Sequence, residues 1–315
     1  MSRRDAGAGE PAGLLLVDKP AGPTSHDIVA LARRALGVRR VGHTGTLDPF
    51  ASGLLLLAVG RATRLVQYMD PLPKTYEATA RLGEATTTDD PEGEVVQRCR
   101  VPHLGEEKLR AGMAAFMGRI RQRPPAYSAK KVGGVPAHRR ARRGEDVQLA
   151  EVEVEVHELE LLEHEAGSAT LSFRVRCSTG TYVRSLARDL ALHLGTCAHL
   201  TLLRRTAIGP WSVDRAVPGG SLERGEGPSG LRSGLVTPLD VLSHLPRLDV
   251  DGEEALKVAY GQRLSRPGQV GAGELCRLAH RGELLAVAEG RSDGLLHPRK
   301  VFQTAEELAD GRKTT

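Results

Sequence analysis

The chain has 315 residues, of which 40% are hydrophobic and 26% are charged. This length is enough for about two domains, and the charged fraction is that of an ordinary globular protein. Aromatic residues make up only 3% of the chain, so its core must consist mainly of leucine, valine and alanine. The formal net charge of +5 suits a polyanionic partner, although net charge alone does not identify one.

The cysteines and the apolar runs favour a soluble, cytoplasmic protein. No two of the four cysteines have the close spacing of zinc ribbons or redox motifs. We therefore expect buried or neutral thiols in a reducing cytosol at Cys99, Cys177, Cys197 and Cys276. Residues 1–12 are small and polar, lack an apolar signal core and are expected to be disordered. The longest apolar run, Leu54 to Val59, is far shorter than the roughly 20 residues of a membrane helix.

Up to residue 118 the pattern predicts short strands mixed with helices. A strand is expected at Leu14–Val17, and a helix that begins at Thr24 or Ser25 should stop at Gly37. The apolar run 53–60 predicts a fully buried strand. The remaining elements expected here are a short helix at 61–69, a strand at 75–82, a turn-rich loop at 86–93 and an amphipathic helix at 106–118.

Residues 119–144 form a basic run with nine lysines and arginines and few acids. A hairpin turn is expected at 131–135, followed by a basic helix that ends at Gly144. A solvated charged face is the usual fate of such a run. Here the prolines at 124–125 and the glycine turn interrupt it, which favours a shaped loop that contacts RNA. Lys131 and Arg142 are the candidate RNA contacts in this run.

The second half of the chain predicts strands at 152–162, 169–177 and 199–208 and a helix at 181–194. Residues 217–234 are rich in Gly, Ser and Pro and are expected to be a flexible linker or insertion. Short strands separated by glycine turns follow at 246–302. Because strands and helices are mixed without strict alternation, we predict an α+β protein, with a main domain at 13–244, a small domain at 246–302 and a tail at 303–315.

Residues 41–53 place one acid, Asp48, in a glycine-rich loop. Asp48 precedes Pro49, which pushes its backbone towards an extended conformation, and glycines at positions 42, 45 and 53 permit close approaches. A free carboxylate has a pKa of about 3.9, so it can attack carbon or accept a proton without a helper base. The alternative is a purely structural role, in which Asp48 lies in an Asp-Pro turn and its side chain caps a neighbouring amide. The loop predicts chemistry by a lone aspartate, with no metal and no second acid beside it.

Three further residues are candidates, each with a structural alternative. His43 could donate a hydrogen bond to a phosphate or a base, or be a satisfied loop histidine. Tyr76 could stack on a nucleobase, or pack within its strand. Arg184, at the start of a predicted helix, could hold Asp48 ionised, or be a surface arginine. Ser-His-Asp triads, Walker loops, paired catalytic acids and metal-ligand spacings are not recognised in the sequence.

Six motifs in order and at consistent spacing resemble the bacterial TruB family of tRNA pseudouridine synthases. They are Leu-Leu-Leu-Val-Asp-Lys-Pro at 14–20, Gly-His-Thr-Gly-Thr-Leu-Asp-Pro at 42–49, Lys-Thr-Tyr at 74–76, Pro-Pro-Ala-Tyr-Ser-Ala at 124–129, Gly-Thr-Tyr-Val-Arg at 180–184 and Leu-Arg-Arg at 203–205. The resemblance implies a pseudouridine synthase fold with a central, mainly antiparallel sheet. It also implies isomerisation of the uridine at position 55 in the tRNA T-loop, with no cofactor.

The same resemblance assigns roles to residues. Asp48 is implied to be the essential aspartate, with Arg184 orienting it and Tyr76 stacking on the flipped base and acting in a late proton removal. The implied substrate contacts are His43, Tyr76, Tyr182 and Leu203, with Lys19 and Pro20 supporting the Asp48 loop. The sequence leaves open whether Asp48 attacks C1′ or removes the 2′ proton. It departs from the family where His138 replaces a frequent aromatic and Val135-Pro136 replaces a basic pair.

Residues 246–302 resemble a PUA domain, through short motifs at 261–264, 282–286 and 296–302. Such a domain would grip the acceptor stem of tRNA. We expect a monomer without an obligate protein partner, because no coiled-coil heptads occur. Two alternatives stay open. One is a non-catalytic RNA-binding or RNA-chaperone protein, and the other is a guide-RNA-dependent synthase that works with partner proteins.

Overall fold

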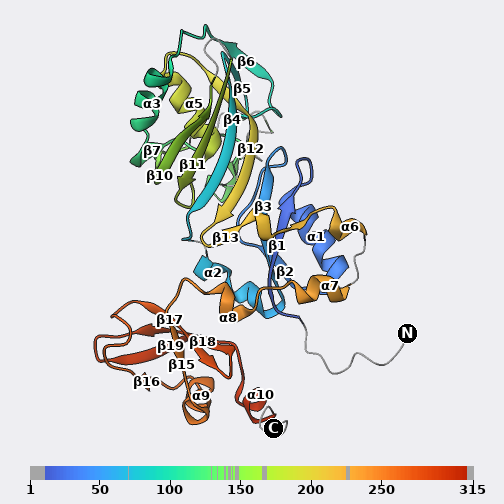
Figure 1. Ribbon diagram of the computed structural model, residues 1–315, viewed down its shortest axis with the longest axis vertical. Coiled ribbons are helices and arrows are strands. Elements are labelled where there is room, and N and C mark those ends of the chain that lie inside the picture. The colour runs from blue at the N-terminus through green and yellow to red at the C-terminus, as the bar shows by residue number, and fades with distance from the viewer. Residues whose placement is uncertain are drawn as a thin grey trace.

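The computed structural model describes residues 11–69, 71–128, 130–132, 134–137, 140, 143, 145, 149–164, 169–224 and 228–310. The predicted disorder of residues 1–12 therefore falls mostly outside the described residues. The molecule is elongated, with long strands at one end, a mixed middle part and a small second sheet at the other end (Figure 1). No helix among the described residues is long and apolar enough to cross a membrane.

A ten-stranded mixed sheet forms the body of the protein. Only the pairs β1/β14 and β3/β12 are parallel and the other pairs are antiparallel, which confirms the predicted mainly antiparallel sheet. In spatial order its strands are β14 (Val217–Pro218), β1 (Gly13–Lys19), β3 (Ser52–Val59), β12 (Ala198–Ile208), β4 (Lys74–Leu82), β11 (Thr170–Cys177), β10 (Val152–Glu163) and β7 (Gly118–Gln122), with β2 (Val41–His43) on β3 and β13 (Trp211–Ser212) on β12.

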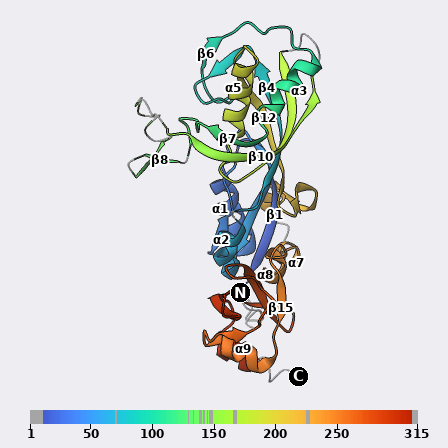
Figure 2. The ribbon, with the colours of Figure 1, turned by 90° about the vertical axis from the view of Figure 1, so that its left-hand side faces the viewer.

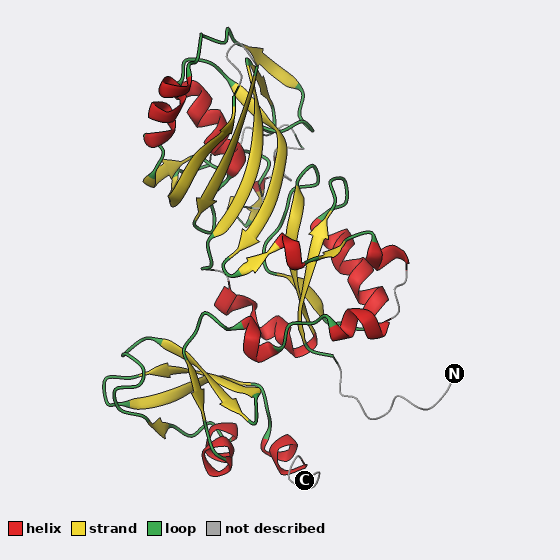
Figure 3. Cartoon of the chain, viewed as in Figure 1, coloured by secondary structure: helices red, strands yellow, loops and turns green. Residues whose placement is uncertain are grey.

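Burial explains the two kinds of strand in this sheet. β4, β10 and β11 alternate between buried and more exposed residues, because helices cover only one of their faces. β1 and β3 are buried almost throughout, because apolar clusters lie on both of their faces. The covering helices on the main core face (Figure 3) are α1 (Ser25–Leu36), α3 (Glu106–Ala114), α5 (Val183–His193), α6 (Ser221–Arg224) and α7 (Pro228–Ser233).

Helix α1 shows how local sequence sets an element. Thr24 caps its first turn in a capping box with Asp27, which satisfies backbone amides that a helix start leaves unpaired. Gly37 ends it in the left-handed conformation, with φ of 66°. The helix therefore matches the predicted boundaries, and its first residue, Ser25, is delivered to a fixed place beside the loop that follows β2.

The two halves of the large sheet meet at one narrow point. There β3 and β12 pair only through Ser52 with Arg204 and Gly53 with Arg205. A Cβ on Gly53 would lie 2.3 Å from the Arg205 carbonyl oxygen, and its φ is +102°, so the contact requires glycine. The loop of residues 44–51 enters β3 at this junction, which places Asp48 between the two halves.

The C-terminal part holds a five-stranded sheet. Its strands, in spatial order, are β15 (Arg247–Asp249), β17 (Leu275–His280), β18 (Glu283–Gly290), β19 (Leu295–Val301) and β16 (Leu264–Ser265), with helices α8 (Pro238–Val241), α9 (Gly252–Ala259) and α10 (Ala305–Asp310) nearby. Leu284, Val287 and Phe302 share one apolar cluster with Leu14 and Leu54 of the main sheet. The C-terminal sheet is thus packed on the body.

Several predicted boundaries are wrong in detail. The helix expected at 106–118 ends at Ala114, because residues 115–117 turn the chain into β7, which begins at Gly118 with φ of 78°. Residues 61–69 form a 3₁₀ segment, Gly60–Leu65, and one turn, α2 (Val66–Met69), in place of one helix. A second 3₁₀ segment spans Val213–Arg215. The turn-rich loop expected at 86–93 is confirmed, as the turn of a hairpin between β5 (Glu84–Thr86) and β6 (Val95–Arg98).

The prediction of a flexible linker at 217–234 is wrong for the described residues of that range. They form β14, which pairs with β1, and helices α6 and α7, which contact α1. Leu222 and Leu231 are buried in the main apolar cluster. Glycine, serine and proline at these positions mark tight turns between short elements, so composition alone misrepresented a part of the core.

The prediction of four free thiols is wrong at Cys99 and Cys197, which form a disulfide across a sequence separation of 98 residues. The bond ties the end of the β5–β6 hairpin to the start of β12, beside Gly83, whose amide donates to the Cys197 carbonyl and whose carbonyl accepts from the Cys99 amide. Cys177 and Cys276 are free and buried as expected, and burial raises the pKa of each to about 11.

Candidate active site

The Asp48 loop is held at several points. The Ser25 hydroxyl at the start of α1 accepts a hydrogen bond from the Leu47 amide at 2.9 Å and donates one to the Leu47 carbonyl at 3.1 Å. The Pro49 carbonyl accepts the amide of Gly22. The Leu47 side chain is buried in the core. These contacts leave the Asp48 side chain 35% exposed, so its carboxylate stays accessible from a rigid loop.

Lys19 lies fully buried beneath this loop at the end of β1. Its ammonium donates hydrogen bonds to the carbonyls of Pro20, Pro23 and Pro49, at 2.9, 2.7 and 3.2 Å. Burial lowers the pKa of Lys19 to about 8, and the nearby Asp48 charge opposes that shift. Pro20 itself is exposed and contributes its carbonyl. Lys19 therefore ties the turn after β1 to the Asp48 loop.

Arg184, at the start of α5, bridges two carboxylates. Its Nε lies 3.0 Å from Asp48 Oδ2, and its Nη1 lies 3.0 Å from Asp90 Oδ2. Its remaining hydrogen bonds go to the carbonyls of Thr88 at 2.7 Å and Tyr127 at 3.0 Å. The surface alternative for Arg184 is excluded, because the side chain is only 5% exposed. The expectation of no second acid beside Asp48 is wrong, since Asp90 and Asp48 both pair with the guanidinium of Arg184.

The charges around Asp48 act in opposite directions. Burial raises the pKa of its carboxyl, and Asp90 adds to that rise. Arg184 and Lys19 lower it, because a nearby positive charge favours the ionised form. The net direction is upward, so Asp48 is a stronger proton acceptor than a free aspartate.

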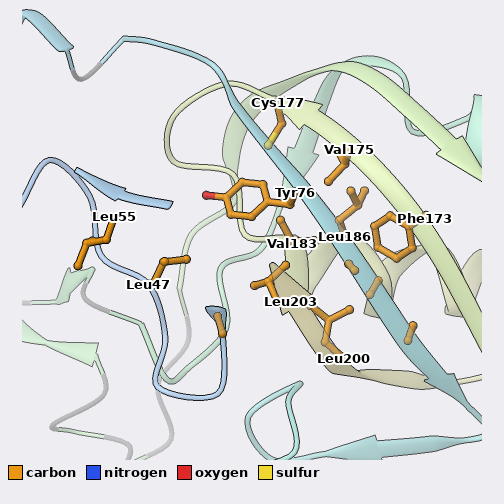
Figure 4. Close-up of a cluster of buried hydrophobic side chains, with 14 of the residues drawn as sticks. Leu47, Leu55, Tyr76, Phe173, Val175, Cys177, Val183, Leu186, Leu200 and Leu203 are labelled. Carbon is orange, nitrogen blue, oxygen red and sulfur yellow. The ribbon is translucent and has the colours of Figure 1, made fainter. Parts of the chain in front are cut away.

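Tyr76 projects from β4 into the core beside Cys177 and Leu203, with its hydroxyl directed towards the segment that carries Leu47 (Figure 4). It is paired across the strands with Arg205 of β12. Burial raises the pKa of the Tyr76 hydroxyl, and Arg205 opposes this rise. Leu203, 5% exposed, belongs to the same apolar cluster as Tyr76.

Arg205 is a third buried cation at the site, after Lys19 and Arg184, and is 1% exposed. Its Nε donates to the Leu54 carbonyl at 2.7 Å, and its Nη atoms approach the carbonyls of Gly45 and Thr46 at 3.2 and 3.4 Å. Arg205 thus ties the Asp48 loop to β12. The sequence motifs assign no role to Arg205, which stands in the Leu-Arg-Arg motif at 203–205, or to Asp90. The adjacent acids at 89–90 in a turn-rich segment were the available signal.

His43 and Tyr182 lie at the edges of the site. The His43 ring packs edge-on against His26, with 5.3 Å between centroids, and its Nδ1 is buried without a hydrogen-bond partner. Burial lowers the pKa of His43, which favours the neutral ring. The Tyr182 backbone exchanges two hydrogen bonds with the Gln122 side chain, at 2.8 and 3.0 Å. That exchange fixes the start of α5 against β7.

The basic run is described only in part. β8 (Lys131–Val132) and β9 (Val135–Pro136) form the predicted hairpin, which lies away from the main body (Figure 2). Arg142 and His138 lie outside the described residues, as does the side chain of Lys131. Their RNA contacts therefore stay predictions. Within the described ranges, no group of three or more His, Cys, Asp or Glu side chains is arranged to hold a metal ion.

The sequence matches a known family and is similar to proteins of several bacteria. Residues 33–183 match the model of the TruB family pseudouridylate synthase N-terminal domain. The chain is 46% identical over 298 residues to the tRNA pseudouridine synthase B of Thermobifida fusca, covering 92% of this chain and 98% of that protein. It is 45% identical over 293 residues to the protein of the same name from Aromatoleum aromaticum, covering 93% of each.

Two solved structures resemble the whole fold. One is an H/ACA RNP bound to a substrate RNA containing 2′-deoxyuridine, with a TM-score of 0.71 and 27% identity over 94% of this chain and 87% of that one. The other is a complex of the archaeal box H/ACA sRNP, with a TM-score of 0.69 and 28% identity over 94% of this chain and 88% of that one.

Proposed function

Because this chain belongs to the TruB family of pseudouridylate synthases, we propose that it isomerises uridine to pseudouridine in tRNA. The observation that carries the proposal is the Asp48 carboxylate, partly exposed on a rigid loop and held by Arg184 at 3.0 Å. The curated relatives at 45–46% identity are named for tRNA modification. The target within tRNA is proposed to be the uridine at position 55 of the T-loop.

The reaction rearranges one nucleoside without a co-reactant. The bond between N1 and C1′ breaks, the base turns, and C5 bonds to C1′. C5 then loses its proton and N1 gains one, so product and substrate have the same atoms. The uridine must first leave its stack, because C1′ and C5 are shielded there. Unpaired loops are the part of RNA whose bases can be splayed out for this.

Asp48 acts at the sugar by one of two routes. Its carboxylate either attacks C1′ as the base leaves, or removes the 2′ proton to give a glycal. Arg184 holds the reacting oxygen pair in place, and Asp90 holds Arg184 from its other side. A raised pKa makes the Asp48 carboxylate a stronger base, which favours both proton removal and attack on carbon.

Tyr76, 8% exposed, is proposed to form part of the wall that the flipped base would meet. Its ring supplies a stacking surface, a contact worth roughly 1–3 kcal/mol per base, together with Leu203 of the neighbouring strand. Its hydroxyl is proposed to assist removal of the C5 proton. His43 is proposed to support the opened loop. Tyr182 is proposed to contact the substrate from the start of α5.

Two parts are proposed to bind the rest of the tRNA. The first is the basic run at 119–144, with Lys131 and Arg142 contacting phosphates. The second is the unit at 246–302, proposed to be a PUA-like domain that contacts the acceptor stem. Residues 13–244 are proposed as the catalytic domain. The protein is proposed to be a cytoplasmic monomer. It is proposed to act without a guide RNA, because its relatives at 45–46% identity are named tRNA pseudouridine synthase B.

The test uses purified protein and unmodified tRNA transcript, with no other protein present. Pseudouridine mapped at position 55 and nowhere else in the transcript is expected. A transcript with cytidine at that position serves as the matched control and should give no product. Absence of pseudouridine would favour a non-catalytic RNA-binding protein, and product only after addition of a guide RNA would favour the guide-dependent alternative.

A further inference from the structure

Helix α5 carries two arginines, one turn apart, that form ion pairs with two adjacent aspartates. Arg184 pairs with Asp90 through Nη1 at 3.0 Å, and Arg188 pairs with Asp89 through Nη1 at 2.8 Å. Residues four apart lie on the same face of a helix, so both guanidinium groups reach the same turn. The inner pair touches Asp48 through Arg184, and the outer pair has no part in the mechanism above.

The outer pair, Arg188 with Asp89, is partly buried and lies in a turn that further hydrogen bonds hold in place. The Asp89 side chain is only 12% exposed, and the Asp89 backbone adopts the left-handed conformation with φ of 59°, which is uncommon outside glycine. The Asp89 carbonyl accepts the Leu200 amide at 3.0 Å, which anchors the turn to β12. Thr86 closes the turn from within by bonding to both backbone groups of Asp90.

Arg188 also reaches the base of the basic run. Its Nη2 donates to the Arg123 carbonyl at 3.0 Å, which also accepts the Ser185 hydroxyl at 2.9 Å. Its Nε bonds to Asp189 at 2.9 Å. Arg184 contacts the same segment through the Tyr127 carbonyl. One helix face therefore fixes both the aspartate turn and the segment that leads into the RNA-binding run.

We propose that Arg188 and Asp89 are a positioning pair for pseudouridine formation. Their ion pair fixes the turn so that Asp90 keeps the Arg184 guanidinium against Asp48. The proposal rests on the proposed function. It assigns the pair an effect on the rate of the chemical step and none on the affinity for tRNA.

The test measures single-turnover pseudouridine formation at saturating enzyme, and tRNA affinity separately, on full-length variants. Asp89→Asn keeps a residue that tolerates the left-handed backbone but removes the charge, and Arg188→Met keeps most of the stem. Each is expected to lower the rate about tenfold, since small misplacements of catalytic groups are costly. The double variant should be no slower than either single one, and Arg188→Lys should recover to within about threefold of the parent.

The control is Arg176→Met, which breaks a more exposed ion pair of the same 2.8 Å length, with Glu158 on the less buried sheet face, and should leave the rate unchanged. Rates of the Asp89 and Arg188 variants within twofold of the parent would overturn the proposal. So would weaker tRNA binding with an unchanged rate, which would make Arg188 a phosphate contact. If Arg188→Met does not fold, Asp89→Asn decides. An inactive parent protein would instead reject the proposed function.

Discussion

Replacing Arg184 by lysine tests how the site holds Asp48. The guanidinium now serves four acceptors at once, namely Asp48, Asp90 and the carbonyls of Thr88 and Tyr127. Lysine keeps the positive charge but presents one compact ammonium on a flexible stem. Such a group can approach one carboxylate closely, and it cannot span the two.

The size of the effect follows from the contacts that are lost. A hydrogen bond to a charged group contributes about 1.5–3 kcal/mol. If the contact with Asp48 is made in the transition state, its loss lowers the rate roughly 10- to 150-fold, at tenfold for each 1.36 kcal/mol. The orphaned Thr88 and Tyr127 carbonyls lie in a buried region, so we expect Arg184→Lys also to lower the free energy of unfolding by roughly 2–4 kcal/mol.

The assay compares single-turnover rates of Arg184→Lys and the parent on the same tRNA transcript, at a temperature where thermal melting shows both to be folded. The control is Arg176→Lys, since Arg176 carries an exposed ion pair of similar length with Glu158. We expect a lower rate and a lower melting temperature for the Arg184 variant alone. A folded Arg184→Lys protein with a rate within threefold of the parent would refute the idea that the bridging guanidinium orients Asp48.

Three further predictions follow from the site. Burial raises the pKa of Asp48, and a carboxyl whose pKa is raised by folding destabilises the folded state at pH values above that pKa. Asp48→Asn should therefore melt at or above the temperature of the parent at pH 7, and this gain should shrink on acidification. A clearly lower melting temperature of the variant at pH 7 would contradict the prediction. Tyr76→Phe should slow the chemistry with little loss of tRNA affinity, and an unchanged turnover would remove its hydroxyl from the mechanism. Cys99→Ser should lower the free energy of unfolding by roughly 3–5 kcal/mol for a loop of this length, measured by denaturant titration without reductant; equal midpoints for variant and parent would argue against a stabilising Cys99–Cys197 bond.

Local signals in the sequence located the elements that depend on neighbouring residues. Thr24, Asp27 and Gly37 act within a few positions of one another, so the boundaries of α1 were predictable. The apolar run of β3 and the alternation of β10 also read directly from the chain. The Asp48 loop was predictable for the same reason, because its proline and glycines restrict the backbone locally.

Pairings between distant positions were not predictable in this way. Asp90 becomes part of the site only because α5, 94 positions later, turns Arg184 towards it. Arg205 reaches the Asp48 loop only through the junction of β3 with β12. Cys99 and Cys197 meet across 98 positions. Segment 217–234 is ordered in its described parts by packing on α1 and β1, which its composition does not reveal.

The most direct test of the account follows tritium released from tRNA labelled at C5 of its uridines, because forming the new C–C bond must displace that atom. The parent protein is expected to release the label from one uridine per tRNA. Asp48→Asn is expected to bind the same tRNA with similar affinity and to release none above background. Appreciable release by a pure Asp48→Asn sample would show that another group performs the reaction.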